Sequence, residues 1–282
     1  MMPTPRAHPL ASLAGCPFRV MDGAGNDFVI VDMRAGGRMT EAAARFLGDR
    51  LGPYGCDQVI GITEGPFMQI WNADGSPAGA CGNAARCVAD ILMEEAGSAD
   101  MRFGSPAGVL AASRDARGMV TVDMGSPRWS WEEIPLSRPV AETRALPLPA
   151  DLLAAHGLDA PVGISMGNPH AVFFVADAEA IALDRLGPRV ETDPLFPGRA
   201  NVTVASPRGG GFRTRTWERG VGITRACGTA ACATLVAAVR TGRKERSAAI
   251  EADGGRLAIS WDAGSGRVLM AGPVRLHRLG TL

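Results

Sequence analysis

One short motif occurs twice in the chain, and this repetition constrains the fold more than any other feature. Residues 80–87 read Ala-Cys-Gly-Asn-Ala-Ala-Arg-Cys, and residues 226–232 read Ala-Cys-Gly-Thr-Ala-Ala-Cys. Cys81 and Cys227 are separated by about half of the 282-residue chain. Each copy opens an apolar run typical of a buried helix. The repetition therefore predicts two related halves whose central helices start at a cysteine, with both thiols flanking one pocket.

The rest of the pattern favours short strands separated by glycine and proline, which is typical of antiparallel sheets. The expected fold class is α+β, with two pseudo-symmetric halves, each a mostly antiparallel sheet wrapped around its central apolar helix, and the active site between them. We expect the halves at 1–133 and 134–271, with the tail 272–282 returning to the first. Besides the two central helices, the pattern predicts helices at 40–51 and 178–186, and strands at 18–21, 28–32, 59–63, 67–71, 101–103, 108–113, 119–123, 162–165, 171–175, 201–205, 212–217, 256–261 and 267–270.

Composition excludes several classes of protein. Lys+Arg and Asp+Glu balance at 29 each, so the charge indicates neither a nucleic-acid nor a membrane partner. No apolar run reaches the ~18 residues that a membrane helix needs. Residues 1–16 contain prolines and no unbroken apolar segment, so we interpret them as a frayed extension rather than a signal peptide. The protein is then expected in the cytoplasm, where its six cysteines remain thiols.

The scarcity of two residue types is also informative. Lys244 is the only lysine and lies in Gly-Arg-Lys-Glu-Arg, a turn-like segment. Pyridoxal phosphate needs a buried lysine for its Schiff base, so this cofactor is improbable and the chemistry is expected to need none. All five asparagines lie beside glycine, proline or a cysteine motif, or begin a strand: Asn26, Asn72, Asn83, Asn168 and Asn201. Their clustering indicates a polar binding site, although turn preference also explains some of them.

A cysteine at a helix start is favoured as thiolate by nearby N–H groups and the helix dipole. Two such thiols on opposite faces of a substrate provide the base and the acid needed to invert a carbon centre. The paired helix starts also aim N–H groups at a carboxylate next to that carbon. We therefore predict cofactor-free two-base proton transfer.

Four alternatives compete with this hypothesis. The cysteines could be small core residues. They could form a zinc site, but no C-x-x-C pair exists, and Cys87 and Cys232 lie roughly 120–140° around the helix axis from Cys81 and Cys227. They could form a redox dithiol, although redox motifs place both cysteines on one turn. A non-catalytic binding module would explain the asparagines but not the matched thiols. We expect no metal, and we interpret Cys87 and Cys232 as core residues and Cys16 and Cys56 as incidental.

Along most of its length the chain resembles the diaminopimelate epimerase family. The resemblance rests on eight segments taken together: Gly-Ala-Gly-Asn-Asp-Phe (23–28), Asp-Gln (57–58), Asn-Ala-Asp-Gly-Ser (72–76), Cys-Gly-Asn (81–83), Gly-Asn-Pro-His (167–170), Asn-Val (201–202), Trp-Glu-Arg-Gly (217–220) and Cys-Gly-Thr (227–229). It implies an isomerase that interconverts LL- and meso-diaminopimelate in lysine and peptidoglycan precursor biosynthesis, with no cofactor. A homodimer is the expected assembly.

The resemblance also implies roles for individual residues. Cys81 and Cys227 would be the catalytic acid and base. The reacting carboxylate would be held by Gly82, Asn83, Gly228 and Thr229, and the distal carboxylate by Asn72, Asn168, Asn201 and Arg219. Glu218 would lie near the distal amine, Asn26 and Gln58 would line the pocket, and His170 and Glu218 would tune the thiols.

The sequence departs from the family pattern at three positions. Ala84 and Ala230 stand where glycine is expected, a change that a first helical turn tolerates, and Ile223 replaces an acidic residue. A proline-type racemase shares the paired-cysteine logic and is the nearest alternative. Such racemases carry histidine at the position of Asn83 and need no clamp for a second amino-acid head.

Overall fold

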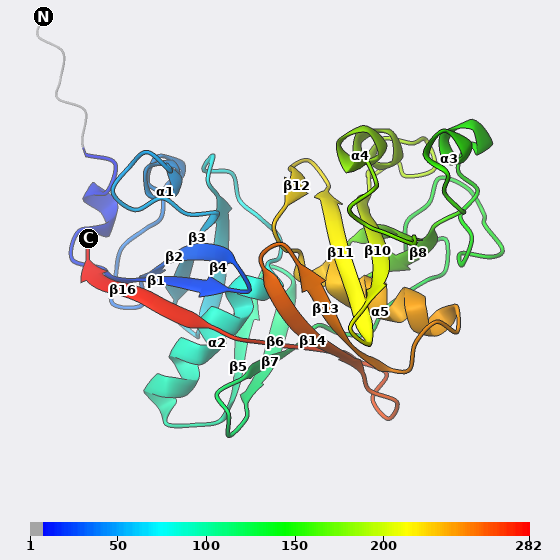
Figure 1. The fold of residues 1–282 in the computed structure, drawn as a ribbon. Helices are drawn as coiled ribbons and strands as arrows, with labels where there is room; N and C mark the ends of the chain where they lie inside the picture. Colours follow the sequence, from blue (N-terminus) through cyan, green and yellow to red (C-terminus); the bar gives the residue numbers. More distant parts are fainter. Residues whose placement is uncertain (1–7) are drawn as a thin grey trace, which may run out of the picture. The chain divides into compact units, whose positions relative to one another are not determined.

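The computed structural model describes residues 8–282, which form two compact units (Figure 1). The first comprises the chain up to Val120 together with Pro273–Leu282, and the second comprises Thr121–Gly272. The predicted α+β class is confirmed: sheets with few helices make up both units. No helix within residues 8–282 combines the length and apolar character needed to span a bilayer.

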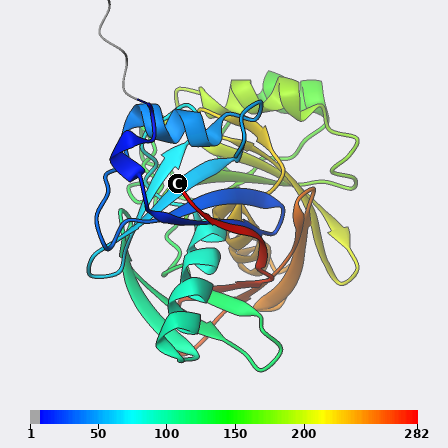
Figure 2. The same ribbon diagram turned by 90° about the vertical axis from the view of Figure 1, so that its left-hand side faces the viewer.

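The first unit holds one sheet in the strand order β16-β1-β2-β3-β4-β5-β6. Four of its six neighbouring pairs are antiparallel, and β2–β3 and β4–β5 are parallel. In chain order its elements are η1 (Ala11–Leu13), β1 (Pro17–Gly23), β2 (Asn26–Asp32), α1 (Glu41–Gly48), β3 (Gln58–Thr63), β4 (Phe67–Asn72), α2 (Gly82–Ala96), β5 (Asp100–Ser105), β6 (Gly108–Arg114) and β16 (Arg275–Thr281). Figure 2 faces this unit and shows the red β16 running along the blue β1, its antiparallel partner.

The second unit has the strand order β7-β15-β14-β13-β11-β10-β9-β8, with β12 paired to β11. Its elements are β7 (Val120–Asp123), α3 (Ala150–His156), β8 (Val162–Ser165), β9 (Pro169–Phe174), α4 (Leu183–Glu191), β10 (Asn201–Arg208), β11 (Gly211–Glu218), β12 (Gly222–Thr224), α5 (Gly228–Arg240), β13 (Ser247–Ala252), β14 (Gly255–Trp261) and β15 (Val268–Gly272). Parallel pairing again occurs twice, at β9–β10 and β11–β13.

The two units repeat one topology. In each, a hairpin (β1–β2 or β8–β9) is followed by a helix and by a strand parallel to the second hairpin strand. An antiparallel strand, the central helix and a second hairpin then follow. In the first unit these are β4, α2 and β5–β6, and in the second unit they are β11, α5 and β13–β14. The duplication predicted from the repeated cysteine motif is thus present in the strand pairing.

Each central helix is buried against strands of its own unit. Helix α2 packs on β1, β5 and β6, and α5 packs on β14, β8 and β9. A helix surrounded in this way must be apolar on nearly all sides, as the alanine-rich sequence of α5 is. Gly23 allows α2 to approach β1, because a Cβ there would lie 2.7 Å from the Asn83 carbonyl oxygen. The predicted core positions of Cys87 and Cys232 are confirmed, since neither is exposed.

Local signals explain where the first two α-helices begin and end. The Thr40 hydroxyl accepts the Ala43 N–H at 3.1 Å and caps α1. Helix α2 ends at Gly97, whose φ of 58° lies in the left-handed region, and the Ser98 N–H bonds the Met93 carbonyl at 3.0 Å. This is the closing pattern that glycine permits without steric cost.

Several predictions of local structure were wrong. Residues 8–16 are not frayed: Leu10 and Leu13 are buried in the core that includes α1, while residues 1–7 lie outside the described part of the chain. The helix expected at 178–186 lies at Leu183–Glu191, and α3 and β13 were not predicted.

Candidate active site

Cys81 is the N-cap of α2, as the repeated motif predicts. Its backbone is extended, with φ −153° and ψ 103°, and its Sγ accepts the backbone N–H of Ala84 at 3.4 Å. Gly82 and Asn83 follow as the first two helical residues, so their N–H groups have no partner within the helix. Alanine at position 84 leaves this contact intact, because only its backbone takes part.

Cys227 occupies the matching N-cap position of α5, with φ −131° and ψ 112°. Its Sγ donates to Glu218 Oε2 at 3.1 Å and lies 3.5 Å from the Thr229 hydroxyl. Burial raises the pKa of the Cys227 thiol well above its ordinary value, and the Glu218 charge raises it further. The Thr229 hydroxyl and the Ala230 N–H oppose this shift without cancelling it. Cys227 is therefore held as a neutral thiol, the form required of an acid.

Glu218 is positioned by the turn that β12 creates. It ends β11, and its Oε1 accepts the Thr224 hydroxyl at 2.6 Å while Oε2 faces Cys227. Glu218 pairs with Gly222 in the β11–β12 ladder, which brings Thr224 back beside the carboxylate. Ile223, the departure from the family pattern, is 44% exposed. One carboxylate oxygen is thus fixed by a hydroxyl and the other is committed to the thiol.

A second line of polar contacts reaches the Cys227 environment from β9. His170 is fully buried, and its Nε2 lies 3.0 Å from Asn168 Oδ1. Asn168 Nδ2 in turn donates to the Thr229 hydroxyl at 3.3 Å. Burial lowers the pKa of His170 to about 3, with a further contribution from the Arg219 charge. The imidazole is therefore neutral at physiological pH, and Nε2 donates to Asn168.

Asn201 supports the segment that carries Glu218 and Arg219. It is 3% exposed, its Nδ2 donates to the Pro169 carbonyl at 3.0 Å, and its Oδ1 accepts the Arg219 backbone N–H at 2.9 Å. The Arg219 side chain is exposed and donates to the Gly198 carbonyl at 3.0 Å. The Asn201 side chain therefore fixes the backbone at the end of β11.

In the first unit, Gln58 and Asn72 lie opposite each other on β3 and β4. Gln58 Nε2 donates to Asn72 Oδ1 at 3.0 Å, and Asn72 Nδ2 donates to the Ser76 hydroxyl at 3.0 Å. Gln58 begins β3 as Asn201 begins β10, and Asn72 ends β4 as Glu218 ends β11. The same topological positions therefore carry polar site candidates in both units.

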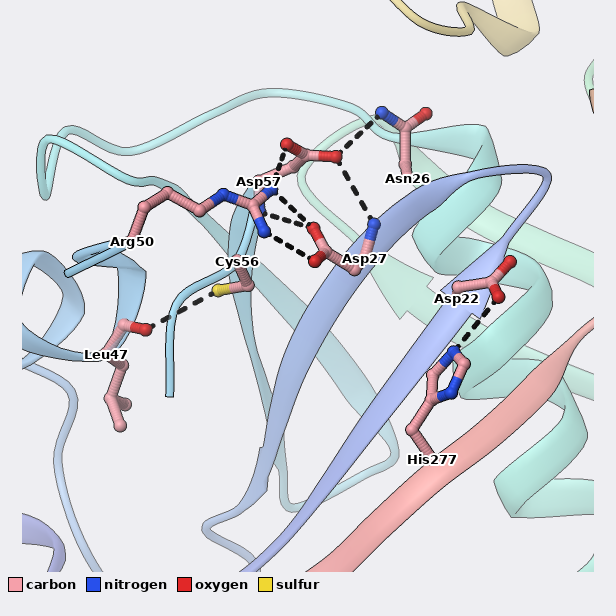
Figure 3. Close-up of polar contacts among 8 residues, drawn as sticks. All are labelled: Asp22, Asn26, Asp27, Leu47, Arg50, Cys56, Asp57 and His277. Carbon is pink, nitrogen blue, oxygen red and sulfur yellow. Dashed lines mark hydrogen bonds and ion pairs between the residues drawn. The ribbon is translucent and has the colours of Figure 1, made fainter. Parts of the chain in front are cut away.

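Asn26 and Asn83 are also hydrogen-bonded to each other. Asn83 Nδ2 donates to Asn26 Oδ1 at 2.6 Å. Asn26 Nδ2 in turn donates to Asp57 Oδ2 at 3.1 Å, as Figure 3 shows. Asn83 is 2% exposed, and its Oδ1 accepts from the guanidinium of Arg86 at 3.1 Å. Asn83 therefore presents its backbone N–H rather than its side chain to a ligand at the start of α2.

The structure thus groups the predicted residues unit by unit. One group surrounds Cys81 with the start of α2 and the Asn83–Asn26 pair, and the other surrounds Cys227 with Glu218, Thr229 and Asn168. Each group offers a thiol and helix-start N–H groups suited to a carboxylate.

Three residues that contribute to these groups were missed or underused by the sequence analysis: Thr224, Arg86 and Asp57. Thr224 carries no sequence signal, because only the β12 turn brings it to Glu218. Arg86 interrupts the apolar run that follows Cys81, and a charge at an otherwise buried helix position is a signal that could have identified it. Asp57 was noted only as part of the segment Asp-Gln (57–58).

A protein-family model described as diaminopimelate epimerase matches residues 18–130 and 162–277. The chain belongs to the diaminopimelate epimerase family. The matched ranges include both cysteines and every candidate residue named above. Epimerases are isomerases, so this family member is an enzyme of that class.

Individual relatives agree with the family assignment. The diaminopimelate epimerase of Rhizorhabdus wittichii is 48% identical over 263 residues, which cover 91% of this chain and 91% of that protein. The diaminopimelate epimerase of Rhodospirillum centenum is 48% identical over 274 residues, which cover 94% of this chain and 91% of that protein. Among solved structures, a PhzF-family phenazine biosynthesis protein from Enterococcus faecalis superposes with a TM-score of 0.68 at 16% identity, covering 95% of this chain and 99% of that one. This last similarity shows that the two chains share a fold.

Proposed function

We propose that the protein interconverts LL-2,6-diaminopimelate and meso-diaminopimelate by two-base proton transfer between Cys81 and Cys227. One observation carries this proposal: both cysteines are N-caps of the central helix at the same topological position of their units. The family assignment supplies the substrate, and the helix starts supply N–H donors for its reacting carboxylate.

The different surroundings of the two thiols support an assignment of their resting states. Cys227 donates to a carboxylate and rests as a thiol, whereas Cys81 accepts the Ala84 N–H at a helix start, which favours its thiolate. In one turnover Cys81 removes the α-proton, and the carbanion electrons pass into the adjacent carboxylate. Cys227 then delivers its proton to the opposite face. The product leaves Cys81 as thiol and Cys227 as thiolate, and proton exchange with solvent then restores the starting state.

The same proposal assigns the binding residues. The N–H groups of Gly82, Asn83, Gly228 and Thr229 hold the reacting carboxylate, where charge develops in the transition state. Asn72, Asn168 and Arg219 bind the distal carboxylate, Glu218 lies near the distal amine, and Asn26 and Gln58 line the pocket. Asn201 contributes by fixing the Arg219 backbone, in keeping with its contacts. His170, neutral and bonded to Asn168, tunes Cys227 through Thr229.

A cytoplasmic homodimer is part of the proposal. Thiol catalysis requires a reducing compartment in which Cys81 and Cys227 are not oxidised. Strand β16 pairs with β1 on one side and exposes Leu276 and Leu279, features that suit pairing with a second copy. Light scattering of the purified protein tests the assembly, with a monomer mass contradicting it.

Chiral chromatography of the reaction mixture tests the activity. LL-diaminopimelate should be converted to the meso isomer, and L-proline supplied at the same concentration should remain unchanged. Turnover of proline at a comparable rate would favour the proline-type racemase instead. Diaminopimelate differs from proline by its distal carboxylate and amine. Lysine provides a second control, because it differs from diaminopimelate only by lacking the distal carboxylate.

A further inference from the structure

A continuous line of polar contacts links the catalytic helix α2 to the loop before β3. It begins at Arg86, which is fully buried on α2 and donates to Asn83 Oδ1 at 3.1 Å. Asn83 donates to Asn26 at 2.6 Å, and Asn26 donates to Asp57 at 3.1 Å. The line therefore runs from Arg86 through two candidate site residues to the Asp57 carboxylate. The proposed mechanism uses neither Arg86 nor Asp57.

The Asp57 end is held by further charges, as Figure 3 shows. Arg50 donates to Asp57 Oδ1 and makes two bonds to Asp27, at 2.6 and 2.7 Å. The Asp57 backbone N–H donates to Asp27 Oδ1 at 2.9 Å, and the Asp27 N–H donates to Asp57 Oδ2 at 3.3 Å. Asp57 is therefore fixed both by its side chain and by its backbone.

The two ends determine which way each asparagine amide points. A guanidinium can only donate and a carboxylate can only accept. Arg86 therefore requires the Asn83 oxygen, and Asp57 requires the Asn26 nitrogen. The remaining ends, Asn83 nitrogen and Asn26 oxygen, then match each other. A flip of either amide would place like groups together in a site where Asn83 is almost fully buried.

We propose that Arg86 and Asp57 are positioning residues that act jointly, through Asn83 and Asn26, to fix the first turn of α2 beside Cys81. The proposal rests on the proposed function for its kinetic consequence. Asn83 is the second residue of α2, so holding its side chain holds the N–H groups assigned to the reacting carboxylate. A Cβ at Gly23 would lie 2.7 Å from the Asn83 carbonyl oxygen and 3.3 Å from the Arg86 and Cys87 side chains, so only glycine lets β1 approach this turn so closely.

A double-mutant cycle between Arg86→Met and Asp57→Ala tests the proposal. In this line of contacts, Arg86 and Asp57 are linked through the two asparagines. If the two residues acted independently, the losses of kcat/KM in the single variants would multiply in the double variant. Each single variant should lower kcat/KM for LL-diaminopimelate about ten-fold, the cost of one charge-assisted hydrogen bond. The double variant should also lose about ten-fold, since the line is already broken. A loss of about a hundred-fold in the double variant would overturn the proposal.

Matched variants separate positioning from a general loss of structure. Asp57→Asn keeps an oxygen that can accept from Asn26, so it should recover most of the activity that Asp57→Ala loses. Glu251→Ala removes another half-exposed carboxylate, paired with Arg208 at 3.5 Å, and should leave kcat/KM unchanged. No recovery in Asp57→Asn, or an equal loss in Glu251→Ala, would contradict the proposal.

The cycle is also measured on thermal unfolding, which does not depend on any substrate. The midpoint of the double variant should equal that of the less stable single variant rather than show the sum of both decreases. If the wild type does not convert diaminopimelate, the proposed function fails while this measurement still decides the coupling. Should Arg86→Met not fold, Asn83→Ala replaces it, because Asn26 still lies between Asn83 and Asp57. Additive effects in that second cycle would equally overturn the proposal.

Discussion

Replacing Glu218 by glutamine should lower the pKa of the Cys227 thiol. The Glu218 carboxylate lies 3.1 Å from Cys227 Sγ and, after burial, is the second cause of the raised thiol pKa. Glutamine keeps the shape and an acceptor oxygen for Thr224 but removes the charge that opposes a thiolate. Deprotonation of Cys227 then no longer places two negative charges side by side.

The size of the change follows from the distance. Two unit charges 3.1 Å apart repel by ~5 kcal/mol at an effective dielectric constant of about 20. This is an upper limit, because Glu218 is half-buried and water screens part of its charge. We therefore expect Glu218→Gln to lower the pKa of Cys227, by less than this limit implies. Burial of the thiol is unchanged, so the pKa should stay above that of a solvent-exposed cysteine.

Alkylation kinetics measure this pKa directly. Iodoacetamide reacts with the thiolate, so the modification rate of the Cys227 peptide against pH gives the pKa, with the peptide read by mass spectrometry. The Cys81 peptide in the same sample serves as the internal reference for the reagent at each pH. The alkaline limb of kcat/KM should move to lower pH in parallel. A Cys227 pKa that stays the same or rises in Glu218→Gln would refute this reading of the site.

Three further predictions concern single residues. Serine at Cys81 or Cys227 should reduce kcat by about 10²–10⁴-fold, the usual contribution of a proton-transfer group, in a standard epimerase assay. Burial raises the pKa of Cys56 to about 12, so this thiol should contribute a fall of ~1.4 kcal/mol per pH unit to the free energy of unfolding between about pH 9 and 11, and urea unfolding of Cys56→Ala should show a slope smaller by that amount. Burial lowers the pKa of His170 to about 3. The neutral imidazole therefore contributes stability above about pH 6.5, and the free energy of unfolding should fall by ~1.4 kcal/mol per pH unit as the pH decreases below that value. In His170→Gln this fall should be smaller. An unchanged slope in either variant would contradict the corresponding assignment.

The central helices could be predicted from sequence because their signals are local. A cysteine followed by glycine and an apolar run defines both the N-cap and the buried face, and Gly97 marks the end of α2. The strands β13 and β16 lack such signals. β13 is rich in alanine, and β16 is exposed at every residue, so neither shows alternating burial. Their pairing with distant strands makes them strands, and that information is not local.

The candidate site shows the same division. The motifs predict which residue types gather near each thiol, because a helix start and a strand end can each be recognised alone. Which side chains meet depends on register: the β11–β12 turn brings Thr224 to Glu218, and the β2–β3 pairing places Asp57 beside Asn26. The contacts of Asn201 could not be predicted for this reason, since Pro169 begins β9 and Arg219 follows the end of β11.

Proton transfer by two bases is the central claim, and turnover in heavy water tests it most directly. The thiol that protonates the inverted carbon exchanges its hydrogen with solvent, so early product should carry deuterium at that carbon. Unreacted LL-diaminopimelate recovered from the same mixture should still carry its original hydrogen, because Cys81 would take the proton from one face only. Mass spectrometry of both isomers at low conversion reads the two positions. Deuterium appearing in the substrate faster than product forms would indicate a single base and would contradict the paired-cysteine mechanism.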